Sequence, residues 1–228
     1  MIQDSVISPV ACSRRPDGVT VWTQRDYDIL QSLAIRIRML SVTQATQIWW
    51  PQHESLRDSR RCLRRLAAGG LVHRYVINAH PLLAVTAPLT SWKPGQPEPD
   101  CHELSLAARR RWNRPTIPLE VFTASKQTAN LFGGVAYGLP RLEQRDHDLL
   151  LADAFVAYRC NRPSEAEHWV GEDFLPKAGF RIKDPDAFLI NDHGQMTHVI
   201  ESAGRYTPKQ INSFHEHCSA LDLPYELW

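Results

Sequence analysis

Residues 183–204 constrain the fold of this chain more than any other segment, because they contain two short apolar runs separated by turn-forming residues. Residues 187–190 and 198–200 each predict a β-strand, and the aspartate and glycine between them predict the turn of a hairpin. Asp186 precedes the first run and Glu201 ends the second. In an antiparallel hairpin the start of one strand lies beside the end of the next, so we expect these two carboxylates to lie together.

Two interpretations of this acidic pair are open. Neighbouring carboxylates supply the oxygen ligands that Mg²⁺ and Mn²⁺ prefer, and such an ion activates water for attack on a phosphate. Asp186 and Glu201 are then candidate metal ligands. The alternative is that they are two unrelated acids at strand ends, and their spacing alone does not separate the two interpretations.

The N-terminal part of the chain predicts three helices followed by a β-hairpin. Capping boxes and helical periodicity predict helices over residues 23–37, 41–49 and 55–68. Apolar runs at residues 71–77 and 82–86, with turn residues between them, predict the hairpin. This order is that of a winged helix-turn-helix, whose third helix normally enters the major groove of DNA.

Arginines are concentrated on the third predicted helix, away from its apolar face. A helix with this many guanidinium groups neutralises several phosphates and reads guanine edges, so the pattern predicts binding to double-stranded DNA. The alternative is a solvated arginine face on a module that binds something else. The candidate DNA-binding residues are Arg57, Arg60, Arg61, Arg64 and Arg65, with Arg74 in the predicted wing.

The composition is that of a globular chain. It has 228 residues, of which 43% are hydrophobic, which is enough for two small domains or one larger one. No apolar run reaches the ~18 residues that a membrane span needs, and the N-terminus lacks the residue order of a signal peptide. The five cysteines include no Cys-x-x-Cys pair, so we expect a reducing, cytoplasmic location.

Periodicity and composition along the chain predict its division into domains. Residues 1–21 show no periodicity and predict a flexible leader, and the Pro-rich residues 91–100 predict a linker. The winged helix-turn-helix then occupies residues 22–90. A second domain occupies residues 101–228.

The acidic pair also carries a resemblance to a known group of enzymes. Pro185-Asp186 followed by Glu201-x-Ala203 resembles the PD-(D/E)xK nuclease signature, in which a Pro-Asp on one strand is followed by an acid-x-Lys on the next. With the winged-helix pattern, this makes the chain similar to the replication-relaxation family, and especially to the MobC-type relaxases of mobilisable plasmids. The other segments that carry the likeness are residues 146–149, 201–206 and 223–228.

The resemblance implies an α/β (α+β) chain, in which an N-terminal winged helix-turn-helix precedes a PD-(D/E)xK nuclease-like mixed-sheet domain. It implies an endonuclease dependent on Mg²⁺ or Mn²⁺, a nickase or relaxase, that acts on an origin-of-transfer-like DNA site in plasmid mobilisation and conjugation. An accessory mobilisation protein is a further partner that it implies.

Under this resemblance, Asp186 and Glu201 would hold the metal ion and take part in catalysis. His147, near the start of a long predicted helix, would lend a polar group to the same site. Asp148 and Asp153 are rivals for that role. A single histidine at the start of a helix is also often a surface or capping residue, so its role stays open.

One position departs from the signature and separates two functions. Ala203 stands where the nuclease signature has lysine, and alanine cannot stabilise the negative charge that develops on a phosphate under attack. Lys209, one turn into the helix predicted after Glu201, is a candidate to replace that lysine. The alternative to an enzyme is a catalytically inactive winged-helix DNA-binding regulator or assembly factor.

Overall fold

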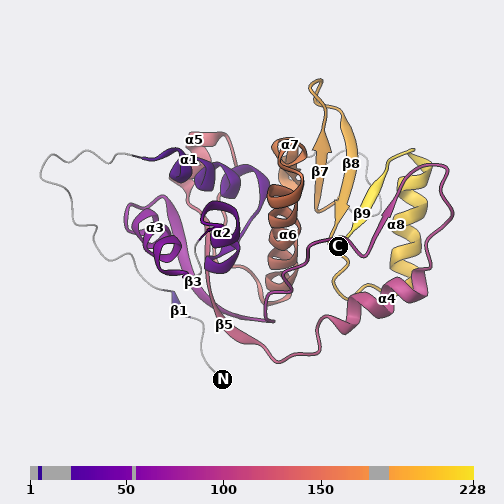
Figure 1. Ribbon diagram of the computed structural model, residues 1–228, viewed down its shortest axis with the longest axis horizontal. Coiled ribbons are helices and arrows are strands. Elements are labelled where there is room, and N and C mark those ends of the chain that lie inside the picture. Colours follow the sequence, from indigo (N-terminus) through magenta and orange to yellow (C-terminus); the bar gives the residue numbers. More distant parts are fainter. Residues whose placement is uncertain (1–4, 7–21, 53–54, 175–184) are drawn as a thin grey trace, which may run out of the picture. The chain divides into compact units, whose positions relative to one another are not determined.

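The computed structural model describes residues 5–6, 22–52, 55–174 and 185–228 (Figure 1). Within these residues the protein is a mixed α and β structure with eight α-helices and two β-sheets. None of the described helices is long and apolar enough to cross a membrane. The chain divides into two compact units, each built from two separate segments. The first unit comprises Met1–Ala79 and Thr116–Ala152, and the second comprises His80–Pro115 and Asp153–Trp228.

Two helices of the first unit begin with the capping boxes that the sequence predicts. Thr23 and Asp26 exchange side-chain to backbone hydrogen bonds at the start of one helix, and Ser41 and Gln44 do the same at the next. A capping box pairs backbone N–H groups that the first turn of a helix leaves without partners. The helices of this unit are α1 (Gln24–Gln31), which continues into a π-helical turn at Ser32–Arg36, α2 (Val42–Trp49), α3 (Arg57–Ala68) and α5 (Lys126–Phe132).

The centre of the first sheet is the pair formed by β3 (Val72–Ala79) and β5 (Ile117–Ala124), which are antiparallel along their whole length. The short strand β2 (Leu40–Ser41) pairs with the other edge of β5. On the far side of β3 lies β1 (Ser5–Val6). β1 belongs to the predicted leader, and the rest of that leader lies outside the described residues.

The prediction that residues 82–86 pair with β3 is wrong. Ala84 has a backbone φ of 48°, and the N–H groups of Leu83 and Ala84 donate to the carboxylate of Asp153 at 3.1 and 2.9 Å. A residue in the left-handed region interrupts the extended backbone that a strand requires. The predicted turn does end β3. The strand that pairs with β3 is β5, which follows it in the chain only after the segment His80–Pro115 of the second unit.

The second sheet has the order β4-β9-β8-β7-β6 and contains the predicted hairpin. Its strands are β4 (Thr90–Trp92), β6 (Trp169–Gly171), β7 (Ala187–Ile190), β8 (Met196–Glu201) and β9 (Tyr225–Leu227). β7 is antiparallel to both of its neighbours, so β6, β7 and β8 form a meander. β9 is parallel to β8, and β4 is antiparallel to β9.

The Pro-rich stretch of residues 91–100 lies within the second unit and begins inside β4. Trp92 is buried, and its ring stacks on that of Tyr225 with the centroids 5.6 Å apart. The remainder of the stretch forms a turn before the next helix, where Asp100 accepts hydrogen bonds from the first backbone N–H groups. Its composition therefore marks a turn between a strand and a helix of one unit.

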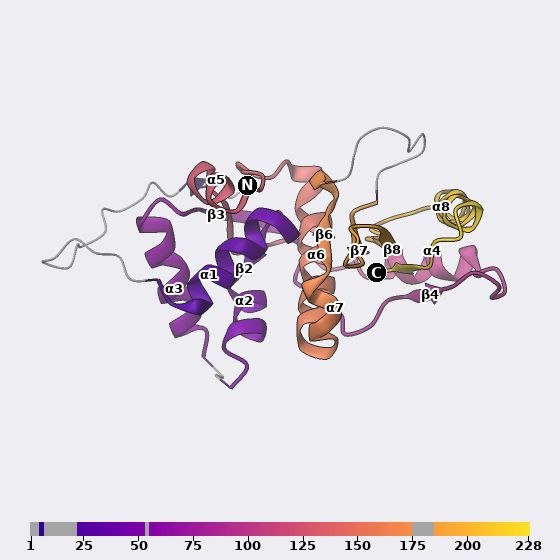
Figure 2. The ribbon, with the colours of Figure 1, turned by 90° about the horizontal axis from the view of Figure 1, so that it is seen from above.

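Helices lie on both faces of the second sheet (Figures 1 and 2). The helices are α4 (Cys101–Arg110), α6 (Leu142–Asn161), α7 (Pro163–Glu167) and α8 (Pro208–Ala220), of which α6 begins in the first unit and ends in the second. α4 and α8 pack together on one face, in an apolar cluster that includes Ile211, Tyr225 and Leu227. Because side chains alternate along a strand, Glu226 points to the other face, towards α6.

Glu226 is a buried carboxylate that joins β9 to α6. It accepts hydrogen bonds from Tyr158 Oη at 2.9 Å, from Trp228 Nε1 at 2.9 Å and from both Nη atoms of Arg162 at 2.7 and 3.0 Å. Burial by itself raises the pKa of Glu226, but the hydrogen bonds and charge of Arg162 outweigh that effect, so the pKa lies below its ordinary value. The buried charge is thus compensated by Tyr158 on α6, by Arg162 directly after that helix and by Trp228 directly after β9.

The first prediction concerns this carboxylate. A lowered carboxyl pKa contributes stability that is present above the unfolded-state pKa, about 4.3, and is lost as the pH falls through the folded-state pKa. Glu226→Gln removes the buried charged partner of Arg162, so we expect a loss of about 3 kcal/mol of unfolding free energy at neutral pH. The variant should also show a weaker fall in stability from about pH 6 to pH 3 than the wild type, measured by urea unfolding.

Glu165→Gln is the matched control, because this acid lies 3.7 Å from the same arginine and its side chain is 47% exposed. We expect it to change the unfolding free energy by less than about 0.5 kcal/mol. Equal effects of the two substitutions would contradict the assignment of Glu226 as the compensated buried charge.

Candidate functional site

The outer face of α3 is the more strongly charged of two candidate sites. The helix buries Ser59, Leu63, Leu66 and Ala67 against the first unit, which leaves its five arginines on the remaining surface beside a single aspartate. This arrangement follows from the 3.6-residue period of a helix, since the apolar residues recur at a spacing of three and four. All six predicted DNA-binding arginines lie in the first unit, five on α3 and Arg74 on β3.

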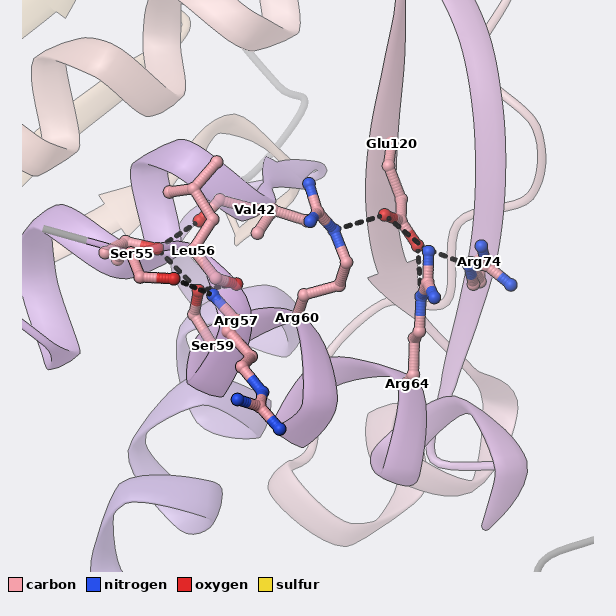
Figure 3. A network of polar contacts seen from close by, with 10 residues as sticks. Val42, Ser55, Leu56, Arg57, Ser59, Arg60, Arg64, Arg74 and Glu120 are labelled. Carbon is pink, nitrogen blue, oxygen red and sulfur yellow. Dashed lines mark hydrogen bonds and ion pairs between the residues drawn. The ribbon is translucent and has the colours of Figure 1, made fainter. Parts of the chain in front are cut away.

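Three of these arginines converge on one carboxylate, that of Glu120 on β5 (Figure 3). Its oxygens accept hydrogen bonds from Arg60 Nε at 3.1 Å, from Arg64 Nε at 2.9 Å and Nη2 at 3.2 Å, and from Arg74 Nε at 2.5 Å. Burial by itself raises the pKa of Glu120, but the hydrogen bonds from Arg64 and Arg74 lower it further than burial raises it. We call these four residues the Glu120 cluster.

Sequence reasoning missed Glu120. It is a single acid in a strand, separated from its arginine partners by the whole segment that belongs to the second unit. No local motif marks it, because the contact exists only once β5 has paired with β3.

A second acid, Asp26 at the start of α1, holds the opposite side of α3. Its carboxylate accepts hydrogen bonds from Arg65 Nη2 at 2.5 Å and from the Cys62 thiol at 3.1 Å, and it caps α1 through Thr23. Burial and the neighbouring carboxylate of Asp26 raise the pKa of Cys62 to about 12, so this thiol stays protonated and serves as a donor. The two buried or half-buried acids therefore fix the two flanks of α3 while its centre faces outward.

The centre of this face is formed by Arg57 and Arg61. The Arg61 side chain is 77% exposed and its ion pair with Asp58, 3.1 Å long, lies on the helix surface. The Arg57 side chain is exposed and makes no ion pair with the described residues. Exposed guanidinium groups with weak or no acidic partners remain available to external anions.

The acidic pair forms the second candidate site, in the second unit. Asp186 and Glu201 are each 1% exposed, and they lie together as predicted. The backbone N–H of Asp186 donates to Glu201 Oε2 at 3.3 Å, and the backbone N–H of Ser202 donates to Asp186 Oδ2 at 2.8 Å. The Tyr206 hydroxyl donates to Glu201 Oε1. The hairpin register explains this arrangement, since Ala187 pairs with Ile200.

A pocket of about 310 Å³ opens beside Glu201. Lys209 and Glu201 both line it, as the sequence argument expects of a lysine one turn into α8. Ala203 lies instead in the apolar cluster under α4 and α8, where it is fully buried. The other lining residues are Tyr206, Thr207, Gln210, Ser213, Phe214 and His217.

The acidic pair supplies two carboxylates to a divalent cation but no complete set of metal ligands. The described residues contain no group of three or more His, Cys, Asp or Glu side chains that would hold a metal by themselves. Mg²⁺ does not require such a group, because it keeps several water ligands and is commonly bound through one or two carboxylates together with phosphate oxygens. The hydroxyl of Ser202, next to the pair, is buried and makes no hydrogen bond with the described residues, so it is a further oxygen in need of a partner.

The other residues suggested for this site have separate surroundings. His147 belongs to the first unit, and its Nδ1 lies 3.3 Å from the Asp148 carboxylate. Asp153, a rival for its role, binds the backbone of residues 83 and 84 and thus supports a loop. The role of His147 at the acidic pair stays a prediction.

Comparison with known proteins identifies no relative: no family model, no curated protein and no solved structure matched the chain.

The second prediction tests the flank of α3 that Asp26 holds. Asp26→Ala removes one of the two hydrogen bonds of the α1 capping box, the partner of Arg65 and the acceptor of the Cys62 thiol, so we expect a loss of about 2 to 4 kcal/mol of unfolding free energy. Asp58→Ala removes the surface partner of Arg61 and should cost less than about 1 kcal/mol. Thermal or urea unfolding of the two variants measures the difference, and similar losses would show that Asp26 is no more important than a surface acid.

Proposed function

We propose that this protein binds double-stranded DNA through the arginine face of α3. The observation that carries the proposal is the concentration of five arginines on one helix whose opposite side is packed into the first unit. A rigid, positively charged helix neutralises phosphates, and its outermost guanidinium groups are suited to guanine edges in the major groove.

The order of elements in the first unit supports this proposal. The chain runs from α1 through β2, α2 and α3 to β3 and β5, and the last two strands pair with each other while β2 pairs with β5. This is the order expected of a winged helix, in which a helix in the position of α3 reads DNA. The wing would then be the connection between β3 and β5, which here contains the segment His80–Pro115 of the second unit.

A second candidate function, DNA nicking at the acidic pair, is favoured by one specific observation. Glu201 and Lys209 line the same pocket, so one proposed metal ligand and a positive charge face the same cavity. Asp186 and Glu201 would hold Mg²⁺ or Mn²⁺, which when bound polarises a phosphate oxygen and lowers the pKa of a bound water. The ammonium group of Lys209 would stabilise the negative charge that develops on the phosphate.

The sheet of the second unit also supports this candidate, since the resemblance implies a mixed sheet, and here β6, β7 and β8 are antiparallel whereas β9 is parallel to β8. Together the two candidates amount to a relaxase-like protein of the replication-relaxation type that acts on an origin-of-transfer-like site. If the acidic pair is inert, the protein is a DNA-binding regulator or assembly factor.

The third prediction tests DNA binding. Arg57→Ala combined with Arg61→Ala removes the two central guanidinium groups of the α3 face and should weaken binding to duplex DNA at least about tenfold at low salt. The slope of log K against log salt concentration should become shallower by about 1.8, since each lost phosphate contact contributes about 0.9. Fluorescence anisotropy over a series of KCl concentrations gives both quantities.

The control for this pair is Arg109→Ala combined with Arg110→Ala, which makes the same change of net charge on exposed positions of α4. The binding proposal fails if both double variants fold and lose the same affinity, because the effect is then one of net charge alone.

The fourth prediction tests the metal site. Mn²⁺ should raise the melting temperature of the wild type, because an ion that binds only the folded state stabilises it by mass action. Asp186→Asn and Glu201→Gln should lose this gain, and both should abolish nicking of supercoiled plasmid in the presence of Mg²⁺ or Mn²⁺. Asp192→Asn, at the exposed turn of the same hairpin, should behave as the wild type.

Calorimetric titration with Mn²⁺ decides between the outcomes. Equal heats for the wild type and both carboxylate variants would eliminate the metal site. Metal binding without any nicked product would leave the regulator as the remaining function.

A further inference from the structure

The Glu120 cluster carries more positive than negative charge. Three guanidinium groups face one carboxylate, so two positive charges remain without an acidic partner in the cluster. The Glu120 side chain is only 13% exposed, whereas those of Arg60 and Arg64 are 41% and 48% exposed. The acid therefore lies underneath, and the cations lie between it and the solvent.

The three arginines use only some of their N–H donors to bind Glu120. Arg60 and Arg74 contact Glu120 through Nε, and Arg64 through Nε and Nη2. Each guanidinium group has five N–H donors. Figure 3 shows the Nη atoms of Arg60 and Arg74 directed away from Glu120, and none of the three arginines makes another ion pair with the described residues. These Nη groups can bind a second acceptor without releasing the first.

The cluster also joins two parts of the surface that a duplex would meet together. Arg60 and Arg64 stand one turn apart on α3, and Arg74 stands on β3. A planar guanidinium group binds two oxygens of a phosphate at fixed geometry only if its own orientation is fixed. A carboxylate bound at Nε supplies that orientation and at the same time cancels one charge.

We propose that Glu120 is a positioning residue that holds the guanidinium groups of Arg60, Arg64 and Arg74 in fixed orientations for the phosphates of duplex DNA. Its negative charge also weakens the attraction of these arginines to DNA of arbitrary sequence. The inference rests on the proposed DNA binding by α3 and goes beyond it, because it assigns a role in binding to an acid. Loss of the Glu120 charge leaves three mobile cations, which attract any phosphate more strongly and release one more counterion.

The test is Glu120→Gln, with a short fluorescein-labelled duplex of arbitrary sequence as the probe. We expect the variant to bind several-fold more tightly than the wild type, with a salt slope steeper by about 0.9. Glu143→Gln makes the same charge change at an exposed position of α6 in the first unit and should leave the slope unchanged. A residue with only a structural role would lower the melting temperature without steepening the salt dependence.

A second pair of variants keeps the proposal testable if Glu120→Gln does not fold. Arg74→Gln removes the cation of the cluster that is not on α3, and it should weaken binding and flatten the slope by about 0.9. Arg141→Gln removes an exposed charge elsewhere in the first unit and should change neither quantity.

The outcomes separate this inference from the proposed function. Suppose that DNA binding by the wild type depends on Arg57 and Arg61, but that Glu120→Gln folds and has the affinity and salt slope of the wild type. This result overturns the inference about Glu120 and leaves the proposed function in place. Equal behaviour of the Arg74 and Arg141 variants overturns the inference as well. No binding of duplex DNA by the wild type overturns the proposed function and the inference with it.

Discussion

The antiparallel pairing of β3 with β5 is the interaction on which the rest of the structure depends. The two strands are consecutive in the first sheet but are separated in sequence by the segment that contributes β4 and α4 to the second unit. Closing so long a loop costs chain entropy, which the full-length ladder and the buried residues of β5 must offset. Once β3 and β5 have paired, β2 can pair with the free edge of β5. The second unit is therefore built from two segments, one between β3 and β5 and one after them.

The same pairing creates the charged surface of α3. Glu120 lies on β5 opposite Val76, and Arg74, two residues away on β3, reaches its carboxylate, as do two arginines of α3. Asp26 fixes the other flank of the helix. Each acid is buried or nearly so, and a buried acid is tolerated only with close donors. The result is a helix whose flanks are tied to the unit and whose centre carries uncompensated charge.

The two candidate sites show opposite solutions to the placement of charge. On α3, cations outnumber acids, and the surplus faces the solvent, which suits a polyanion. At the acidic pair, two carboxylates are buried beside each other and are met by backbone N–H groups and by the Tyr206 hydroxyl. Neutral donors reduce the repulsion between two carboxylates but do not cancel it, and a cation does. This is the physical basis of the proposal that Mg²⁺ or Mn²⁺ binds at Asp186 and Glu201.

The sequence by itself determined the features that depend on neighbouring residues. The capping boxes at Thr23 and Ser41, the arginine face of α3 and the β7–β8 hairpin with its two carboxylates all follow from local spacing, because helix caps, helix faces and tight hairpins form within one segment. Only the tertiary structure decided that β5 pairs with β3 and that Glu120 meets three arginines. Strand pairing across a long sequence separation leaves no local signal, because the residues of one strand do not indicate which other strand will pair with it.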